Sequence, residues 1–283
     1  MRVLIDGDSC YVLDMVVVLS RLMNFDVVVF AVSEATTRHI DYKFTLCELG
    51  PDSADNVIVE QMEAGDVIIT DDNLLAYRCM ERGGKVLSNS GLVYDLADFV
   101  KKGDLLKNTH RNKSRKEIVG KYLDFIKVFF ELMGYTPPTC IHDGTIHIFR
   151  LGFNKDQRII RKRAIAVAAY FGYKFRFYTR SEKLAQRNPD FAVLLPNNEN
   201  KNLDLVAGFK KSDVVVTSEN YFASKVLALG ARAINHEGYV FNRRDYHKSK
   251  KNPVQPVKSL NKKQLHEGKF CESLISLLSS DVK

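Results

Sequence analysis

The sequence predicts an α/β protein made of two tandem domains, each with a mostly parallel sheet. Short β-branched runs, such as the one at 67–70, alternate with helical patterns along the 283 residues. This alternation is typical of parallel strands joined by crossover helices. The segment 66–99 also recurs without a gap as 213–246, at an offset of 147 residues. Because a chain of this length has room for about two domains of ~150 residues, we expect domains at 1–136 and 137–283.

Identical residues at equivalent positions support a tandem duplication. They are the pairs Asp66/Asp213, Thr70/Thr217, Asn73/Asn220, Ala76/Ala223, Gly83/Gly230, Gly91/Gly238 and Asp98/Asp245. The amino-terminal residues 2–8 match 150–156 at an offset of 148, which pairs Asp6 with Asn154. The join is expected within 134–139, where Pro137 and Pro138 would break a helix.

Each copy is expected to alternate strands and helices in the same order. In the first copy we expect strands at 3–5, 26–31, 44–49, 67–70 and 85–87, and helices at 10–23, 54–63, 74–81 and 115–133. In the second copy we expect strands at 146–153, 175–178, 191–195, 214–217 and 232–234, and helices at 157–170, 202–209, 221–229 and a last one ending near 278. Asp8 or Ser9 is a candidate cap for the first helix, since a side-chain oxygen there satisfies free amides.

Acidic residues follow two strands of the first copy and open one of its helices. Asp6 and Asp8 follow the first strand, Asp71 and Asp72 follow the strand at 67–70, and Asp55 opens the helix at 54–63. The carboxyl ends of parallel strands meet at one edge of a sheet, so these carboxylates are expected to converge. Converging carboxylates raise one another's pKa unless a cation is bound, and hard divalent ions prefer such oxygens. The pattern therefore predicts a Mg²⁺ or Mn²⁺ site, with Asp6 and Asp72 as the main ligands.

Each acid also has a plain structural interpretation. Asp8, Asp55 and Asp72 are all placed where a helix N-cap would stand. Asp66 precedes its strand, at the opposite edge, and is expected to be structural. The convergence of several acids, rather than any one of them, favours the metal site, and a bound metal would activate water for phosphodiester hydrolysis.

Basic residues are concentrated just ahead of the last helix of each copy. Residues 101–121 hold eight Lys or Arg and two acids, and residues 243–269 hold nine and two, whereas the whole chain carries a net charge of +8. Clustered cations suggest a polyanion such as nucleic acid. A solvated linker and tail would show the same pattern. The candidate nucleic-acid contacts in these segments are Lys113, Arg115, Lys250 and Lys251.

Three motifs of the first copy are VLIDGDSC, SADNVIVEQMEAGDVIITDDNLLA and GGKVLSNSGLVY, which together span most of residues 1–99. In this order they resemble the YaiI/YqxD family of PIN-like nuclease domains. The sequence departs from the family pattern at Tyr11, where proline is usual, and at Asp71, where a small residue is common. The resemblance implies an α/β/α sandwich, a divalent metal held by Asp6, Asp8, Asp55 and Asp72, and hydrolysis of RNA or, less often, DNA.

The second copy has lost acids and gained bases. Asp55 aligns with Asn202 and Asp71 with Ser218, while Asp156 and Glu219 remain. The helix after Asp156 carries a basic set of Arg158, Arg161, Lys162 and Arg163. We expect this copy to bind phosphate without catalysing, and to pack on the first copy about a pseudo-two-fold axis within a monomer.

Two other classes of function remain open. A haloacid-dehalogenase-like phosphatase also begins with a strand and Asp-x-Asp, but Cys10 stands where it needs Thr or Val. A nucleic-acid-binding protein without turnover would explain the basic segments alone. No uncharged apolar run reaches the ~18 residues needed to span a membrane. The five cysteines form no CxxC pair, so we expect a reducing, cytoplasmic setting.

Overall fold

The computed structural model describes residues 1–8, 10–32, 43–50, 52–101, 119–137, 143–149, 156–195, 207–242 and 267–279. The chain divides into two compact units: Met1–Lys116 with Gly120–Thr136, and Glu117–Val119 with Pro137–Lys283. Each unit holds one five-stranded sheet in which every strand pairing is parallel. The predicted α/β class with parallel sheets is confirmed.

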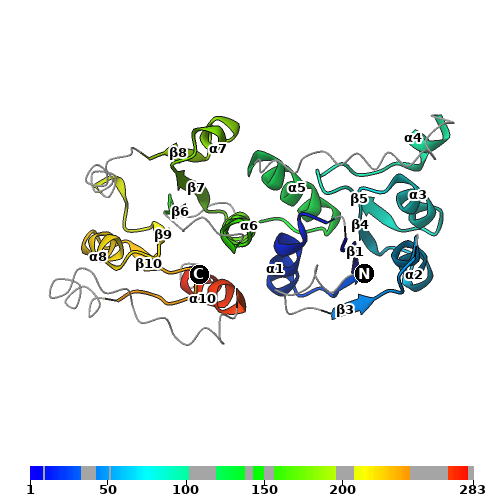
Figure 1. Ribbon diagram of the computed structural model, residues 1–283, viewed down its shortest axis with the longest axis horizontal. Helices are drawn as coiled ribbons and strands as arrows, with labels where there is room; N and C mark the ends of the chain where they lie inside the picture. The colour runs from blue at the N-terminus through cyan, green and yellow to red at the C-terminus, as the bar shows by residue number, and fades with distance from the viewer. Residues whose placement is uncertain are drawn as a thin grey trace. The chain divides into compact units, whose positions relative to one another are not determined.

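The first unit orders its strands β3-β2-β1-β4-β5. Its strands are β1 (Val3–Asp6), β2 (Val27–Ala31), β3 (Lys43–Leu46), β4 (Val67–Ile69) and β5 (Lys85–Leu87). Its helices are α1 (Leu13–Met23), α2 (Ser53–Gln61), α3 (Asn73–Glu81), α4 (Leu96–Lys101) and α5 (Val119–Leu132). Figure 1 shows α2 and α3 on one side of the sheet and α1 and α5 on the other. Helices on both faces explain why β1, β2 and β4 are apolar without alternation, apart from the final Asp6.

The second unit repeats this order as β10-β9-β6-β7-β8. Its strands are β6 (Thr145–Ile148), β7 (Lys174–Thr179), β8 (Ala192–Leu194), β9 (Val214–Val216) and β10 (Arg232–Ile234). Its helices are α6 (Asp156–Phe171), α7 (Glu182–Arg187), α8 (Asn220–Ala228) and α10 (Glu267–Ser279). In both units the first strand lies at the centre, and the chain builds outward first on one side and then on the other. Sheets of this kind bind ligands where the order reverses, at the carboxyl ends of the central strands.

Several expected elements differ in the structure. The first helix begins at Leu13 rather than Cys10, and its N-cap residue Val12 makes no side-chain cap bond. The short helices α4 and α7 were not predicted, because six residues are too few to show a helical period. The strand expected at 146–153 ends at Ile148. Most of the helix expected at 202–209 lies outside the described residues.

The register of the two sheets corrects the alignment of the first strands. Val3 pairs with Val67 in the first unit, and Ile146 pairs with Val214 in the second. Because 67 and 214 are equivalent by the repeat, Val3 corresponds to Ile146 and Asp6 to Phe149. The match of residues 2–8 to 150–156 is therefore wrong for the strand, although it holds for the helix ends, where Met23 and Phe171 are equivalent. The loop between the first strand and the first helix differs in length between the copies, and an ungapped comparison cannot detect that.

Candidate functional site

Asp6 and Thr70 join the two central strands of the first unit at their carboxyl ends. The hydroxyl of Thr70 donates a 3.1 Å hydrogen bond to Oδ2 of Asp6, and the same oxygen of Thr70 accepts one of 3.0 Å from the amide of Asp72. Thr70 is fully buried and Asp6 is 8% exposed. The carboxylate of Asp6 is thus fixed in orientation at the point where the strand order reverses.

Asp72 is the N-cap of α3. Its Oδ1 accepts hydrogen bonds from the amides of Leu74 (2.7 Å) and Leu75 (3.0 Å). The capping interpretation of this residue is therefore confirmed. A capping carboxylate is also held in a fixed orientation by the amides it accepts.

Asp55 lies in the first turn of α2 and is half-buried. Burial, followed by the charges of Asp6, Asp72 and Asp52, raises the pKa of Asp55 to about 6, and only Arg78 opposes this. The N-cap of α2 is Asp52, so Asp55 is not a cap. Asp6 and Asp72 therefore lie close enough to Asp55 for their charges to act on it.

Asp8 and Asp71 are directed elsewhere. Oδ2 of Asp8 accepts the amide of Val32, just beyond β2, at 3.0 Å. This explains why Asp8 does not cap α1 as expected. Oδ1 of Asp71 accepts the amide of Asn89, beyond β5, at 2.9 Å. Neither acid is among the charges that raise the pKa of Asp55.

The three carboxylates supply oxygen ligands suited to a hard divalent ion. Among the described residues, no group of three or more His, Cys, Asp or Glu side chains stands close enough to enclose a metal. Mg²⁺ does not need such a cage, since proteins commonly bind it through one or two carboxylates while it keeps several waters. The donor set of Asp6, Asp55 and Asp72 fits a hydrated ion of that kind, and an ion would offset the burial and the repulsion that raise the pKa of Asp55.

Asp66 is structural, as predicted. It lies at the opposite edge of the sheet, where its carboxylate accepts bonds from the amide of Arg2 (2.8 Å) and from the Arg2 guanidinium (2.7 Å). The amide of Glu63 adds a third, at 3.0 Å. Burial alone would raise the pKa of Asp66, but these bonds hold it below its ordinary value.

The equivalent edge of the second unit is largely aromatic, although Glu219, the N-cap residue of α8, keeps an acid at the position of Asp72. Phe149 takes the place of Asp6, is fully buried, and stacks on Phe222 with ring centroids 3.8 Å apart. Tyr178 and Phe209 extend the same cluster. Ser218, in the place of Asp71, shares a 2.6 Å hydrogen bond with His236. At the position where the first unit has the carboxylate of Asp6, the second unit has the stacked rings of Phe149 and Phe222.

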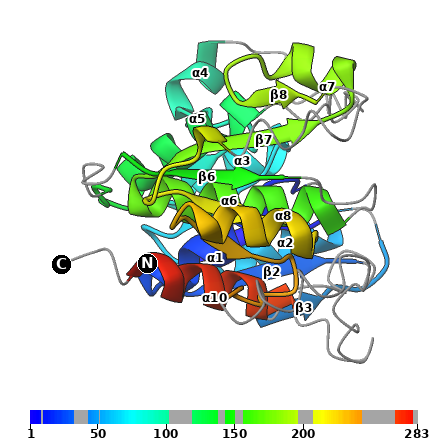
Figure 2. The same cartoon turned by 90° about the vertical axis from the view of Figure 1, so that its left-hand side faces the viewer.

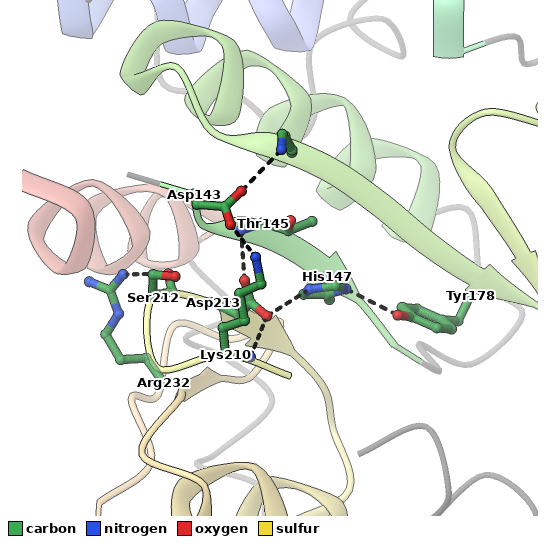
Figure 3. A network of polar contacts seen from close by, with 9 residues as sticks. Asp143, Thr145, His147, Tyr178, Lys210, Ser212, Asp213 and Arg232 are labelled. Carbon is green, nitrogen blue, oxygen red and sulfur yellow. Dashed lines mark hydrogen bonds and ion pairs between the residues drawn. The ribbon is translucent and has the colours of Figure 1, made fainter. Parts of the chain in front are cut away.

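A buried polar network lies at the amino edge of the second sheet, and no sequence pattern indicated it. Figure 3 shows Asp213 at its centre, with the amides of Thr145 and Lys210 each donating to the carboxylate at 2.8 Å. Nε2 of His147 lies 3.3 Å from Oδ2 of Asp213, outside hydrogen-bond geometry, and Nδ1 of His147 is 3.1 Å from the Tyr178 hydroxyl. His147 occupies the position of Leu4, so the duplicated aspartate has exchanged its arginine partner for an imidazole.

The basic residues predicted on α6 do not share one environment. Arg158 is exposed, whereas the guanidinium of Arg161 lies 5.7 Å from the centre of the Phe177 ring on β7. Lys162 is half-buried. Arg163 is only 4% exposed, which disagrees with its predicted contact to a nucleic acid, since a buried guanidinium is not presented to phosphate. Lys113, Arg115, Lys250 and Lys251 lie outside the described residues.

Comparison with models of protein families shows which family the chain belongs to. The model of a family described as uncharacterized, the YaiI/YqxD family, matches residues 4–119 and again residues 156–253. The chain belongs to the YaiI/YqxD family. Two successive matches in one chain agree with the tandem duplication seen in the two sheets.

Individual members of the family are similar over part of the chain. A UPF0178 protein of Saccharophagus degradans is 39% identical over 94 residues, which cover 32% of this chain and 62% of that protein. A UPF0178 protein of Jannaschia sp. is 37% identical over 95 residues, covering 32% and 60%. One from Natranaerobius thermophilus is 30% identical over 125 residues, covering 43% and 81%. The chain thus spans about three-fifths of the first two relatives. No solved structure gives a significant match.

A membrane-spanning helix is absent from the described part of the chain, where no helix is both long and apolar enough.

Proposed function

We propose that the first unit is a divalent-metal-dependent phosphodiesterase that cleaves nucleic acid, RNA in preference to DNA. The observation that carries the proposal is the placement of Asp55 beside Asp6 and Asp72, where burial, followed by the charges of these neighbours, raises the pKa of Asp55 to about 6. Strongly perturbed carboxylates at the switch point of a parallel sheet are typical of functional sites. The resemblance of this family to PIN-like nucleases favours the same chemistry.

Asp6 and Asp72 are the residues that would hold Mg²⁺ or Mn²⁺, with Asp55 beside them. When bound, such an ion would orient a water molecule and neutralise charge on a phosphodiester oxygen. The chain's own contribution is orientation: Thr70 fixes the carboxylate of Asp6, and the amides at the start of α3 fix that of Asp72. Asp55 holds a proton up to about pH 6 and would release it when a cation enters.

The second unit is proposed to be non-catalytic. Phe149 stands where Asp6 stands in the first unit, and its ring is packed in an aromatic cluster. A carboxylate is the main ligand this chemistry requires, so the aromatic replacement removes the activity from this copy. We also propose that the chain works as a monomer in the cytoplasm, which suits the lack of a disulfide at the described cysteines Cys10, Cys47, Cys79 and Cys271.

The test is cleavage of labelled single-stranded RNA and DNA in Mn²⁺, Mg²⁺ or EDTA. Cleavage is expected with either metal, and it should be lost in EDTA and in Asp6→Asn. Glu60→Gln, an exposed acid on the same helix as Asp55, is the matched control and should cleave normally. Cleavage that persists in Asp6→Asn would show that the site is elsewhere or that the activity is a contaminant. Hydrolysis of p-nitrophenyl phosphate without any cleavage of oligonucleotides would instead support the phosphatase class.

A further inference from the structure

Strand β7 of the second unit has a solvent-exposed basic side that its counterpart in the first unit lacks. Along Lys174–Thr179 the residues alternate, with Phe175 and Phe177 buried and Lys174 and Arg176 exposed. The equivalent strand β2 is buried at all five positions. By the strand register, Arg176 corresponds to Val28, which is 5% exposed and packs in the core cluster of the first unit. A core valine has therefore been replaced by an exposed arginine.

The replacement coincides with a change in what covers the sheet. In the first unit α2 packs on β1 and β2, and its residues Ile58 and Val59 share a core cluster with Val28. In the second unit Arg161 of α6 reaches the ring of Phe177, so α6 covers the face opposite Arg176. Figure 2 shows α8 in front of the lower part of the second sheet, whereas no helix among the described residues lies in front of β7. Arg176 is thus exposed on a face of the sheet where no described helix packs over this strand.

Further cations continue this row. Lys174 precedes Arg176 on the same side, and Arg180, also exposed, follows one residue beyond the strand. Lys210 reaches the same edge from the chain before β9, where it and Lys174 share the carboxylate of Asp143 (Figure 3). Alternate residues of a strand are roughly 6.6 Å apart, so Lys174 and Arg176 are neighbours on this side of β7. Arg180 follows beyond Tyr178, which occupies the position between Arg176 and Arg180. Over the described residues, bases outnumber acids in the second unit, and the reverse holds in the first.

We propose that this β7 surface, defined by Lys174, Arg176, Arg180 and Lys210, binds the phosphates of single-stranded nucleic acid. The proposal rests on the function proposed above, since it assigns the substrate's binding surface to the second unit. Cations that follow one exposed strand suit the extended backbone of a single-stranded nucleic acid, whose affinity comes from phosphate contacts rather than base reading. Arg176 is the central contact, because Lys174 and Lys210 are partly neutralised by Asp143 whereas no acid is paired with Arg176 in the described network.

The test is binding of fluorescein-labelled single-stranded RNA and DNA by anisotropy in EDTA, at salt concentrations from about 50 to 200 mM. EDTA prevents metal-dependent cleavage, so the measurement reports on binding alone. Arg176→Gln removes the charge and keeps the length of the side chain, and Arg176→Glu reverses the charge. Lys127→Gln, an exposed lysine on α5 of the first unit, is the charge-matched control.

Each lost phosphate contact should reduce the slope of log affinity against log salt by about 0.7 for a single strand. Arg176→Gln should therefore flatten the slope by about this amount and weaken binding of RNA and DNA alike. Arg176→Glu should weaken it further, and Lys127→Gln should bind as the wild type does. Circular dichroism of each variant checks that the fold is kept. Wild-type affinity and slope in Arg176→Glu would overturn the proposal.

The two proposals fail separately. If Asp6→Asn abolishes cleavage but Arg176→Glu still binds normally, the catalytic proposal stands and the β7 surface is not the binding site. If the Arg176 variants lose binding while no metal supports cleavage, the surface is supported and the catalytic proposal is overturned. Arg176→Gln could lose heparin and RNA binding equally, and the protein could show no preference for single strands over duplex. That combination would show a general polyanion surface and overturn the assignment to single strands.

Discussion

Replacing Asp55 by asparagine is expected to stabilise the metal-free protein at neutral pH. Burial and the neighbouring carboxylates raise the pKa of Asp55 from 3.8 to about 6 in the folded chain. Each pKa unit corresponds to about 1.4 kcal/mol, so ionising Asp55 in the folded state costs roughly 3 kcal/mol. The folded-state pKa of Asp55 is higher than the unfolded-state pKa. The contribution of protonated Asp55 to the free energy of unfolding is therefore fully present below about pH 4 and is lost as the pH rises through about 6.

The assay is urea unfolding in EDTA at about pH 4 and about pH 7.5. Asp55→Asn carries no titrating group, so it should be more stable than the wild type at the higher pH, by at most about 3 kcal/mol, and should gain little at the lower pH. Glu60→Gln on the same helix should stay within about 0.5 kcal/mol of the wild type at both. Mg²⁺ should then stabilise the wild type more than Asp55→Asn. A variant no more stable than the wild type at about pH 7.5 would refute the reasoning.

Two further substitutions test the framework around the site. Asp66→Ala should destabilise the first unit by about 2–3 kcal/mol, because it leaves the Arg2 guanidinium and two amides without their acceptor, and the loss should show as a lower urea midpoint. Phe149→Ala should destabilise the second unit by about 4 kcal/mol through the cavity it opens against Phe222, while metal-dependent cleavage by the first unit, assayed below the unfolding transition, is unchanged. Cleavage lost in folded Phe149→Ala would contradict the assignment of activity to the first unit.

The sequence was sufficient to predict the parallel sheets and the acidic edge of the first unit. Strands such as Val67–Ile69 are short, β-branched and followed at once by polar residues, so both their type and their carboxyl ends can be read directly. The strand order places Asp6 and Asp72 at the same edge, and the start of α2 adds Asp55. The orientation of Asp8 and Asp71 does not, because each carboxylate binds an amide that comes from a different part of the chain.

The second unit was harder to predict because its changes depend on register. Phe149 and Asp6 are equivalent only when the strands are paired in space, and the sequence alignment placed Asn154 there instead. The exposure of Arg176 likewise depends on which helix covers β7, and a single strand's alternation does not reveal that. Arg163 resembles its exposed neighbour Arg158 in sequence, yet only one of them reaches solvent.

The aromatic replacement at Phe149 has a consequence for how such a duplication can evolve. Once a ring had filled the place of the carboxylate and stacked on Phe222, a single reversion to aspartate would bury a charge among aromatic side chains and leave a void beside it. Both effects oppose folding, so an isolated back-mutation would be eliminated before it could restore any ligand. A return of the second copy to the acidic edge of the first would therefore need several substitutions at once, in the ring as well as in its partners.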